Sequence, residues 1–224
     1  MKLTLFDLDH TLLPLDSDYS WGQFTTRLGW TDADAFARRN DDFYAHYQAG
    51  TLDIHDYVRF ATEAARVQGR AAAEAAHARF MDEVIRPAMQ ARALDLVRQH
   101  QAAGDTVLIV TATNEFVTRP IAQAFGVQEL IAVELARDAS GWITGEIAGT
   151  PSFRDGKVAR VQAWLQHHGL VRDQVQITFY SDSMNDLPLL EQADRPVATN
   201  PDPRLRALAQ TRGWPVLDLF ETPT

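Results

Sequence analysis

Short apolar segments that end abruptly in acidic or hydroxyl side chains recur along this chain of 224 residues. Three such junctions are Phe6-Asp7, Val110-Thr111 and Tyr180-Ser181-Asp182. Apolar runs of this length are typical of buried strands, and in an open parallel sheet ligands bind beyond the carboxyl ends of the strands. We therefore expect these polar side chains to converge on one crevice at one edge of a sheet.

Strand-like and helix-like segments alternate through the second half of the chain. The predicted strands are 2–6, 106–110, 130–135, 142–147, 175–180, 197–198 and 214–217, with 142–147 as the hairpin partner of 130–135. The predicted helices run through 93–97 toward Gly104, and over 117–125, 157–168, 187–193 and 204–210. This alternation is typical of an α/β fold with a Rossmann-like parallel sheet.

A mostly helical block separates the first predicted strand from the others. Apolar residues such as Trp21 recur there at helical spacing, and about four helices fit. The Ala-rich run 71–78 is interpreted as helix because Ala is the strongest helix former. Thr31 followed by Asp34 resembles a capping box, which predicts a helix start at that point.

Length and composition fit a globular protein with an inserted domain. Hydrophobic residues make up 46% of the chain and charged residues 23%, a balance typical of globular proteins. A chain of 224 residues is long enough for a core that carries a smaller insertion. We expect an α/β core of residues 1–15 and 91–224, with residues 16–90 as a helical cap.

Charge and residue content exclude several classes of function. The formal net charge of −9 repels polyanions, so no nucleic-acid partner is expected. The absence of cysteine excludes disulfides, thiolate nucleophiles and cysteine-based metal sites. No segment approaches the ~20 apolar residues of a membrane span, and the first strand leaves no room for a secretory leader. We therefore expect a cytoplasmic protein without a membrane partner.

Four carboxylates are grouped at two of the predicted strand ends. Asp7 and Asp9 are two residues apart after the first strand, and Asp182 and Asp186 follow the strand 175–180. Oxygen-only groups suit Mg²⁺, which keeps several waters and binds one or two carboxylates plus a substrate phosphate. No His-Glu-x-x-His helix and no P-loop motif is present. The sequence therefore predicts Mg²⁺ rather than zinc or a P-loop nucleotide.

In this order, the motif residues resemble those of the haloacid dehalogenase superfamily. Asp7-Leu8-Asp9-His10-Thr11 is similar to its first motif, Thr111 to the second, Lys157 to the third and Asp182-Ser183-Met184-Asn185-Asp186 to the fourth. The helical block after the first motif resembles the phosphoserine-phosphatase-like branch. In that branch the fourth motif usually begins Gly-Asp-Gly, whereas this chain has Ser181-Asp182-Ser183. The resemblance covers the core from end to end and implies a phosphatase.

The resemblance also implies a role for each motif residue. Asp7 would be the nucleophile that forms an aspartyl phosphate, and Asp9 would act first as an acid and then as a base. Thr111 would donate its hydroxyl to a phosphoryl oxygen, and Lys157 would offset the charge of the phosphate. The implied Mg²⁺ ligands are the Asp7 carboxylate, the Asp9 backbone carbonyl and Asp182. Asp186 and Asn185 would lie next to these ligands without binding the metal directly.

The expected substrate is a small phosphorylated metabolite. Asp16 and Asp18 follow the first motif closely and are candidates to bind a substrate amine, with solvated acidic surface as an equal alternative. Thr11 and Arg59 are further candidates for substrate binding. Phosphoserine phosphatases carry a cap arginine for the substrate carboxylate, where this chain has Ala61. An amino-alcohol phosphate is therefore expected, and histidinol phosphate competes with phosphoserine.

Two other functions stay open on the sequence. A phosphotransferase or mutase would use the same Asp7 intermediate and pass the phosphoryl group to an acceptor other than water. A non-catalytic binding protein would be expected to lack one of the motif residues, and none is missing. Haloacid dehalogenation needs neither Mg²⁺ nor a second aspartate, so Asp9 argues against that reaction.

Overall fold

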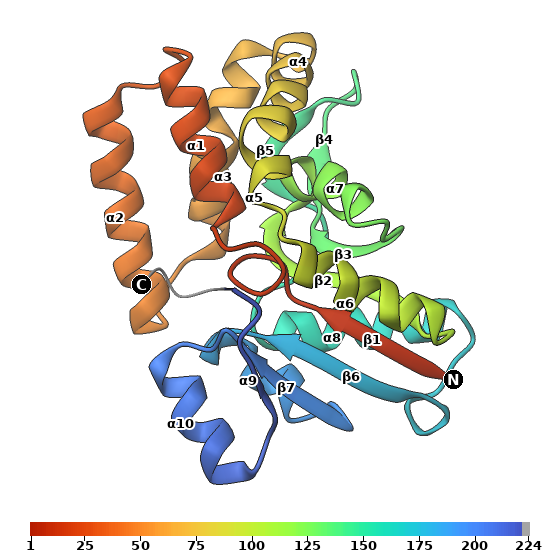
Figure 1. The fold of residues 1–224 in the computed structure, drawn as a ribbon. Helices are drawn as coiled ribbons and strands as arrows, with labels where there is room; N and C mark the ends of the chain where they lie inside the picture. The colour runs from red at the N-terminus through yellow and green to blue at the C-terminus, as the bar shows by residue number, and fades with distance from the viewer. Residues whose placement is uncertain (221–224) are drawn as a thin grey trace.

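The computed structural model describes residues 1–220, and at its centre is a six-stranded parallel sheet (Figure 1). The strands of the sheet are Lys2–Phe6 (β1), Thr106–Asn114 (β2), Glu129–Val133 (β3), Gln176–Ser181 (β6), Arg195–Thr199 (β7) and Val216–Leu217 (β8). Their order is β3-β2-β1-β6-β7-β8, so the first strand lies in the middle. A separate antiparallel hairpin is formed by Leu135–Arg137 (β4) and Ile143–Ile147 (β5). The predicted α/β class is confirmed.

Helices surround this sheet and extend beyond one of its edges. They are Ser17–Arg27 (α1), Ala33–Ala49 (α2), Ile54–Gln68 (α3), Arg70–Phe80 (α4), Arg86–Ala88 (α5), Ala91–Ala102 (α6), Glu115–Ala124 (α7), Asp155–His167 (α8), Leu187–Leu190 (α9) and Pro203–Arg212 (α10). A π-helical turn, Met81–Ile85, connects α4 to α5, and 3₁₀ turns occur at Arg172–Gln174 and Met184–Asp186.

Alternate side chains of the central strands cover the two faces of the sheet. Phe6 and Ile109 pack on the face that α6 and α7 cover. Leu5 and Leu108 pack on the opposite face, against α8, α9 and α10. All four side chains are fully buried, and each contributes roughly 1.5–3 kcal/mol to folding. The central strands are therefore apolar on both faces, as expected of a parallel sheet between two helical layers.

Helices α1 to α5 lie together beyond the carboxyl end of β1 (Figure 1). Aromatic side chains hold this segment together, with Trp21 of α1 stacked on Phe24 and in edge contact with Phe80 of α4. Trp21 also contacts Phe116 of α7, with the ring centroids 5.8 Å apart. The helical segment is thus packed onto the α/β core next to the strand ends, and the β4–β5 hairpin packs along α3.

Aspartates begin the first three helices. The side chains of Asp16, Asp32 and Asp53 accept hydrogen bonds from backbone N–H groups in the first turns of α1, α2 and α3. Each such cap contributes about 1 kcal/mol. The expected capping box of Thr31 and Asp34 is wrong by one residue, because the Asp32 carboxylate accepts the hydrogen bond in the first turn, at 2.8 Å.

Most predicted elements match the structure to within a few residues, with two differences. The predicted hairpin strand 130–135 is divided, because Glu129–Val133 pairs with β2 in the parallel sheet and the partner of β5 is Leu135–Arg137. The second difference is that β2 is longer than expected. It continues to Asn114 instead of ending at Val110, because its pairing with β3 resumes at Val133 after an irregularity. The Ala-rich run 71–78 lies inside α4, as predicted. The longer β2 matters for function because its last residues reach the strand-end site described below.

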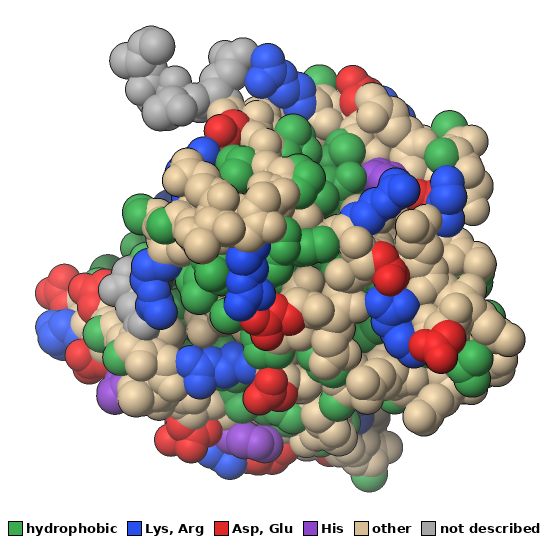
Figure 2. Space-filling view, turned by 90° about the horizontal axis from the view of Figure 1, so that it is seen from below, with side chains coloured by type: hydrophobic (Ala, Val, Ile, Leu, Met, Phe, Trp, Pro, Cys, Tyr) green, Lys and Arg blue, Asp and Glu red, His purple; other side chains and the backbone are tan. Residues whose placement is uncertain are grey.

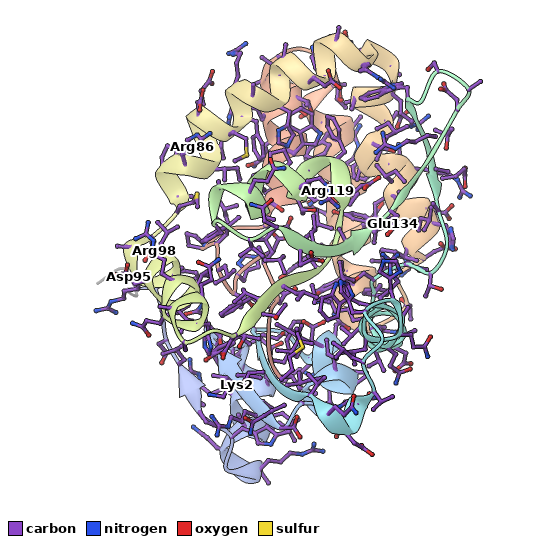
Figure 3. All side chains as sticks on the ribbon, turned by 90° about the vertical axis from the view of Figure 1, so that its right-hand side faces the viewer. Lys2, Arg86, Asp95, Arg98, Arg119 and Glu134 are labelled. Atoms are coloured by element: carbon purple, nitrogen blue, oxygen red, sulfur yellow. The ribbon has the colours of Figure 1, made fainter. Side chains whose placement is uncertain are left out.

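The surface carries both signs of charge. Figure 2 shows acidic and basic side chains interspersed on one face, with hydrophobic atoms between them. In Figure 3, Asp95 and Arg98 lie on the outer side of α6, where they form an ion pair of 3.3 Å. Exposed pairs of this kind contribute about 0–1 kcal/mol each. Within residues 1–220, no helix combines the length and the apolar character needed to cross a membrane.

Candidate active site

Asp7 directly follows β1 and is held at the carboxyl edge of the sheet. Its backbone N–H donates to the Tyr180 carbonyl at 2.9 Å, which continues the pairing of β1 with β6. The side chain is buried, and Lys157 Nζ lies 2.7 Å from its Oδ1 while Thr11 Oγ1 lies 3.2 Å from its Oδ2. Burial raises the pKa of Asp7, and the Lys157 charge opposes that shift. Both oxygens are therefore fixed in one orientation.

Lys157, in the first turn of α8, joins two loops that are far apart in the sequence. Its side chain is buried, and Nζ donates to Asp7 at 2.7 Å and to Asp186 at 2.8 Å. Burial lowers the pKa of Lys157, but the facing charges of Asp186 and Asp7 outweigh this effect and hold the pKa above its ordinary value. The ammonium group therefore stays charged at neutral pH.

Thr11 connects Asp7 to Asp182. Its hydroxyl accepts a hydrogen bond from the Asp182 backbone N–H at 3.1 Å, and it lies 3.2 Å from Asp7 Oδ2 and 3.1 Å from Asp182 Oδ1. The hydroxyl has one hydrogen, so it donates to one of these oxygens at a time. Thr11 is fully buried by these contacts. It therefore positions two carboxylates, and its expected role in substrate binding stays a prediction.

The carboxylates of Asp7 and Asp182 fit a bound divalent cation. Burial raises the pKa of Asp182 well above its ordinary value, and the charges of Asp7 and Asp186 add to the shift. A cation between the two carboxylates would remove this repulsion. Within residues 1–220, no group of three or more His, Cys, Asp or Glu side chains is arranged to hold a metal. Mg²⁺ accepts the smaller set of two carboxylates because water and a substrate phosphate complete its coordination.

Asp9 is held between the start of α1 and the end of β2. Its Oδ1 accepts a hydrogen bond from Ser17 N at 2.9 Å, and its Oδ2 accepts one from Thr113 Oγ1 at 2.8 Å. Burial, followed by the charge of Asp16, raises the pKa of Asp9 to about 6. A carboxyl group with this pKa can give and take a proton near neutral pH. These donors engage both oxygens of the Asp9 side chain.

The second motif lies inside β2 rather than at its end. Thr111 is buried, and its Oγ1 accepts a hydrogen bond from Thr113 N at 3.1 Å. This contact uses the hydroxyl as an acceptor and leaves its hydrogen for another partner. The register of β1 with β2 pairs Phe6 with Ile109, so Thr111 lies at the level of the residue that follows Asp7.

The two aspartates proposed to select the substrate differ in their surroundings. Asp16 is the N-cap of α1, and its Oδ1 accepts a hydrogen bond from Tyr19 N at 2.8 Å. Asp18 is buried, and its Oδ1 accepts a hydrogen bond from Asn114 Nδ2 at 3.2 Å. Burial, followed by the charge of Asp16, raises the pKa of Asp18 to about 8, while the Tyr57 hydroxyl acts against the shift. Asp18 is therefore a buried acid rather than a solvated surface residue.

Arg59 is not part of this group of residues. Its Nε and Nη2 lie 2.8 Å and 3.0 Å from the two carboxylate oxygens of Glu146 on β5, and its Nη1 lies 2.7 Å from Asp56. The ion pairs are exposed, and they tie α3 to the hairpin. The two-point contact with Glu146 holds the guanidinium on the outer surface, and the expected role of Arg59 in substrate binding stays a prediction.

The serines of the fourth motif have specific partners. Ser181 Oγ donates to Asp186 Oδ2 at 2.7 Å, and Ser183 Oγ accepts a hydrogen bond from Asn185 N at 3.2 Å. Ser183 Oγ also lies 3.2 Å from the hydroxyl of Tyr47, at the end of α2. The hydroxyls at these two positions therefore brace the loop and connect it to the helical segment.

Several residues in this group were missed by the sequence analysis. Thr113 and Asn114 follow Thr111 in a polar run at the end of an apolar strand, a signal that the sequence contains. Tyr47 and Tyr57 show no local signal, since aromatic residues at helical spacing are typical of core packing. Arg154, whose Nε and Nη2 lie 3.3 Å and 3.4 Å from Asn185 Oδ1, was also missed.

Comparison with known proteins identifies the family of this chain. The family model described as haloacid dehalogenase-like hydrolase matches residues 4–191. The chain is similar to the histidinol-phosphatase of Neisseria meningitidis serogroup C (strain 8013), with 41% identity over 219 residues that cover 97% of this chain and 98% of the relative. It is also similar to the phosphoserine phosphatase SerB1 of Mycobacterium tuberculosis (strain ATCC 25618 / H37Rv), with 31% identity over 95% of this chain and 69% of the relative.

Solved structures share the fold. A protein of unknown function from Bordetella pertussis Tohama I is 52% identical and superposes with a TM-score of 0.91, over 98% of this chain and 99% of that one. A substrate-bound phosphoserine phosphatase superposes with a TM-score of 0.64 at 16% identity, over 96% of this chain and 92% of that one. At that identity the likeness concerns the fold alone. On the family match and its relatives, the chain belongs to the haloacid dehalogenase-like hydrolases and is a phosphatase.

Proposed function

We propose that this phosphatase hydrolyses a small phosphomonoester whose leaving group carries an amine, with histidinol phosphate preferred over phosphoserine. The reaction passes through an aspartyl phosphate on Asp7. The main support is the difference between two aspartates that are two residues apart. Asp7 is fixed by Lys157 and Thr11, whereas Asp9 has a pKa of about 6 and is held between the start of α1 and the end of β2. One is built as a nucleophile and the other as a proton carrier.

The two half-reactions use these aspartates in turn. A carboxylate oxygen of Asp7 bonds to phosphorus as the bond from phosphorus to the alcohol oxygen breaks, and Asp9 gives its proton to that oxygen. A water oxygen then bonds to phosphorus, the bond to Asp7 breaks, and Asp9 takes a proton from the water. Mg²⁺ held by Asp7, Asp182 and the Asp9 carbonyl would neutralise charge on the phosphoryl oxygens. Thr111 and Lys157 bind the phosphoryl group and offset its charge.

We assign the choice of leaving group to residues 16–90, as a cap on a catalytic core of residues 1–15 and 91–224. Asp18 supports this assignment, because it comes from α1, is buried, and lies close enough to Asp9 for each charge to affect the other. A buried carboxylate with a raised pKa gains most from a cationic partner. Ala61 stands where phosphoserine phosphatases carry a cap arginine, and Arg59 is held by Glu146. Both observations favour a substrate without a carboxylate.

The experiment is a comparison of purified wild-type and Asp7→Asn proteins on histidinol phosphate and phosphoserine in the presence of Mg²⁺. We expect wild type to release equal amounts of alcohol and inorganic phosphate, with a higher kcat/KM for histidinol phosphate. Asp7→Asn should release none, because an amide keeps the shape of the side chain but forms no acyl phosphate. Mass spectrometry must show that the variant has not deamidated back to aspartate.

Three results would count against the proposal. Turnover by Asp7→Asn would exclude the nucleophile, and a preference for phosphoserine would exclude the selection against a carboxylate. Alcohol release in excess of inorganic phosphate, when glycerol is added, would indicate transfer to an acceptor other than water.

A further inference from the structure

Arg154, the residue directly before α8, has a backbone conformation that glycine adopts easily and arginine does not. Its φ is +52° and its ψ is −122°. Its carbonyl accepts a hydrogen bond from Lys157 N at 3.0 Å, so this strained residue begins the helix that carries Lys157. A glycine would begin the helix without strain. Strained residues are common at functional sites, so the side chain of Arg154 is a candidate for a functional role.

The guanidinium of Arg154 lies where three parts of the molecule meet. Nε and Nη2 lie 3.3 Å and 3.4 Å from Asn185 Oδ1, in the loop of the fourth motif. The group lies over the Phe153 ring, 5.2 Å from its centroid. A methyl group added to Gly50, at the end of α2, would be 2.4 Å from Nη2. The side chain therefore fills the space between α8, the fourth-motif loop and α2.

The contact with Arg154 fixes the orientation of the Asn185 amide. Arginine has only donors, so the amide atom that faces it must be the oxygen, and Nδ2 must point away from it. The Tyr47 hydroxyl interacts with Asn185 and lies 3.2 Å from Ser183 Oγ. These four side chains form one polar network that joins the end of α2 to the fourth-motif loop.

Two residues at the start of α8 therefore hold two adjacent residues of one loop. Lys157 binds Asp186, and Arg154 binds Asn185. We propose that Arg154 is a positioning residue for phosphoryl transfer. It holds the fourth-motif loop in place relative to Lys157, and it packs between this loop and the end of α2. The loop also carries Asp182, so a shift of the loop moves the acids around Asp7. The proposal rests on the proposed function, because its kinetic test needs a phosphatase reaction.

The kinetic test rests on three single variants, of which two remove or displace the Arg154 guanidinium and the third leaves it in place. Arg154→Gly removes the side chain and relieves the strain, so the fold should persist with a Tm within a few degrees of wild type. Gly50→Ala puts a methyl group where Nη2 lies and should displace the guanidinium. Gly29→Ala is the matched control, because Gly29 has a φ of +76°, against +74° at Gly50, but has nothing within 4 Å of the added carbon.

We expect Arg154→Gly and Gly50→Ala to lower kcat with histidinol phosphate about 10- to 100-fold, with a smaller change in KM, because misplaced catalytic groups lose rate more than binding. Gly29→Ala should keep the wild-type kcat per folded molecule. In the double variant, Gly50→Ala should add no further loss to Arg154→Gly, since the displaced group is already absent. Arg154→Lys should restore part of the rate, because the lysine ammonium group supplies a hydrogen-bond donor but lacks the planar set of donors of the guanidinium.

Two kinetic results would overturn the proposal. One is a kcat within about twofold of wild type for Arg154→Gly, and the other is an equal loss in Gly29→Ala and Gly50→Ala. A wild-type protein that hydrolyses no phosphate ester would refute the proposed function instead. In that case crystal structures of wild type and Arg154→Gly give a direct test. An Asn185 amide and a fourth-motif loop that do not move when the arginine is removed would overturn the positioning role.

Discussion

Lys157 Nζ lies 2.7 Å from Asp7 Oδ1, although the two residues are 150 positions apart in the sequence. The same ammonium group lies 2.7 Å from Asp186 Oδ1, and both contacts are buried. One cation thus faces two carboxylates, with the carboxylate of Asp182 close by through Thr11. The site carries an excess of negative charge, which a divalent cation would balance but which a phosphate alone would increase.

Lys157→Met should abolish phosphate release and lower the free energy of unfolding. The variant leaves two buried carboxylates without their cation, and breaking a buried ion pair in this way costs about 3–5 kcal/mol. We expect the free energy of unfolding in urea to fall by that amount at neutral pH. Phosphate release should be lost even under conditions where the variant is folded.

Asp186→Asn in the Lys157→Met background is the control. Removing one of the unpaired charges should recover part of the free energy of unfolding, because it removes a desolvation penalty. It should recover no activity, since the counter-charge of Asp7 is still missing. Equal stability of the single and double variants would contradict the assigned role of the pair.

Asp18→Asn should weaken the binding of an amine-bearing phosphate. Loss of a hydrogen bond to a charged group costs about 1.5–3 kcal/mol, which corresponds to a rise in KM of about ten- to a hundredfold. Hydrolysis of an uncharged aryl phosphate should change little, because it makes no contact that needs the Asp18 charge. The measurement is the ratio of kcat/KM values for the two substrates.

Asp16→Asn is the comparison variant for that measurement. Asparagine caps a helix as well as aspartate does, so α1 should keep its cap while the charge disappears. We expect a smaller effect than that of Asp18→Asn, because Asp16 is more exposed than Asp18. If both variants lose activity on both substrates in equal proportion, these aspartates shape the loop and do not select an amine.

Asp18 also gives the free energy of unfolding a pH dependence of defined sign. Burial and the charge of Asp16 raise its pKa from 3.8 to about 8 in the folded state. Between these values the folded protein keeps a proton that the unfolded chain has released. The free energy of unfolding should therefore fall as pH rises from about 4 to about 8, by at most about 1.4 kcal/mol per pH unit from this group.

Asp18→Asn should remove that contribution. We expect the free energy of unfolding of the variant minus that of wild type to increase between about pH 5 and about pH 8 in urea titrations. A difference that stays constant over this range would mean that Asp18 releases its proton in the folded protein as easily as in the unfolded chain.

Activity should require Mg²⁺, and Ca²⁺ should inhibit it. Asp7 and Asp182 offer oxygen ligands only, and Ca²⁺ prefers more ligands and longer bonds than Mg²⁺. Chelation followed by addition of each ion, with phosphate release as the measurement, checks this. Full activity after exhaustive chelation would show that Lys157 alone provides the counter-charge.

The strand-end residues were predictable because their signal is local. An apolar run followed by Asp7 or Asp182 marks a buried strand and its end, whatever the rest of the chain does. The same pattern at Thr111 located the strand but not its end, because β2 continues to Asn114. The α/β class followed from the same patterns, since alternating strands and helices leave few topologies. Asp7 and Asp182 do lie at one edge of the sheet, connected through Thr11.

The partners of these residues were settled by packing that no local pattern records. Lys157 looks like any helix lysine in the sequence, and its role follows from the docking of α8 against the sheet. Arg59 has the same chemistry as a substrate-binding arginine, but α3 packs on β5 and Glu146 takes its guanidinium. Asp18 is buried where α1 meets the end of β2, with Asn114 donating a hydrogen bond to its Oδ1. The sequence sets which chemical groups are present, but side-chain direction, desolvation and charge pairing arise only when distant segments pack together.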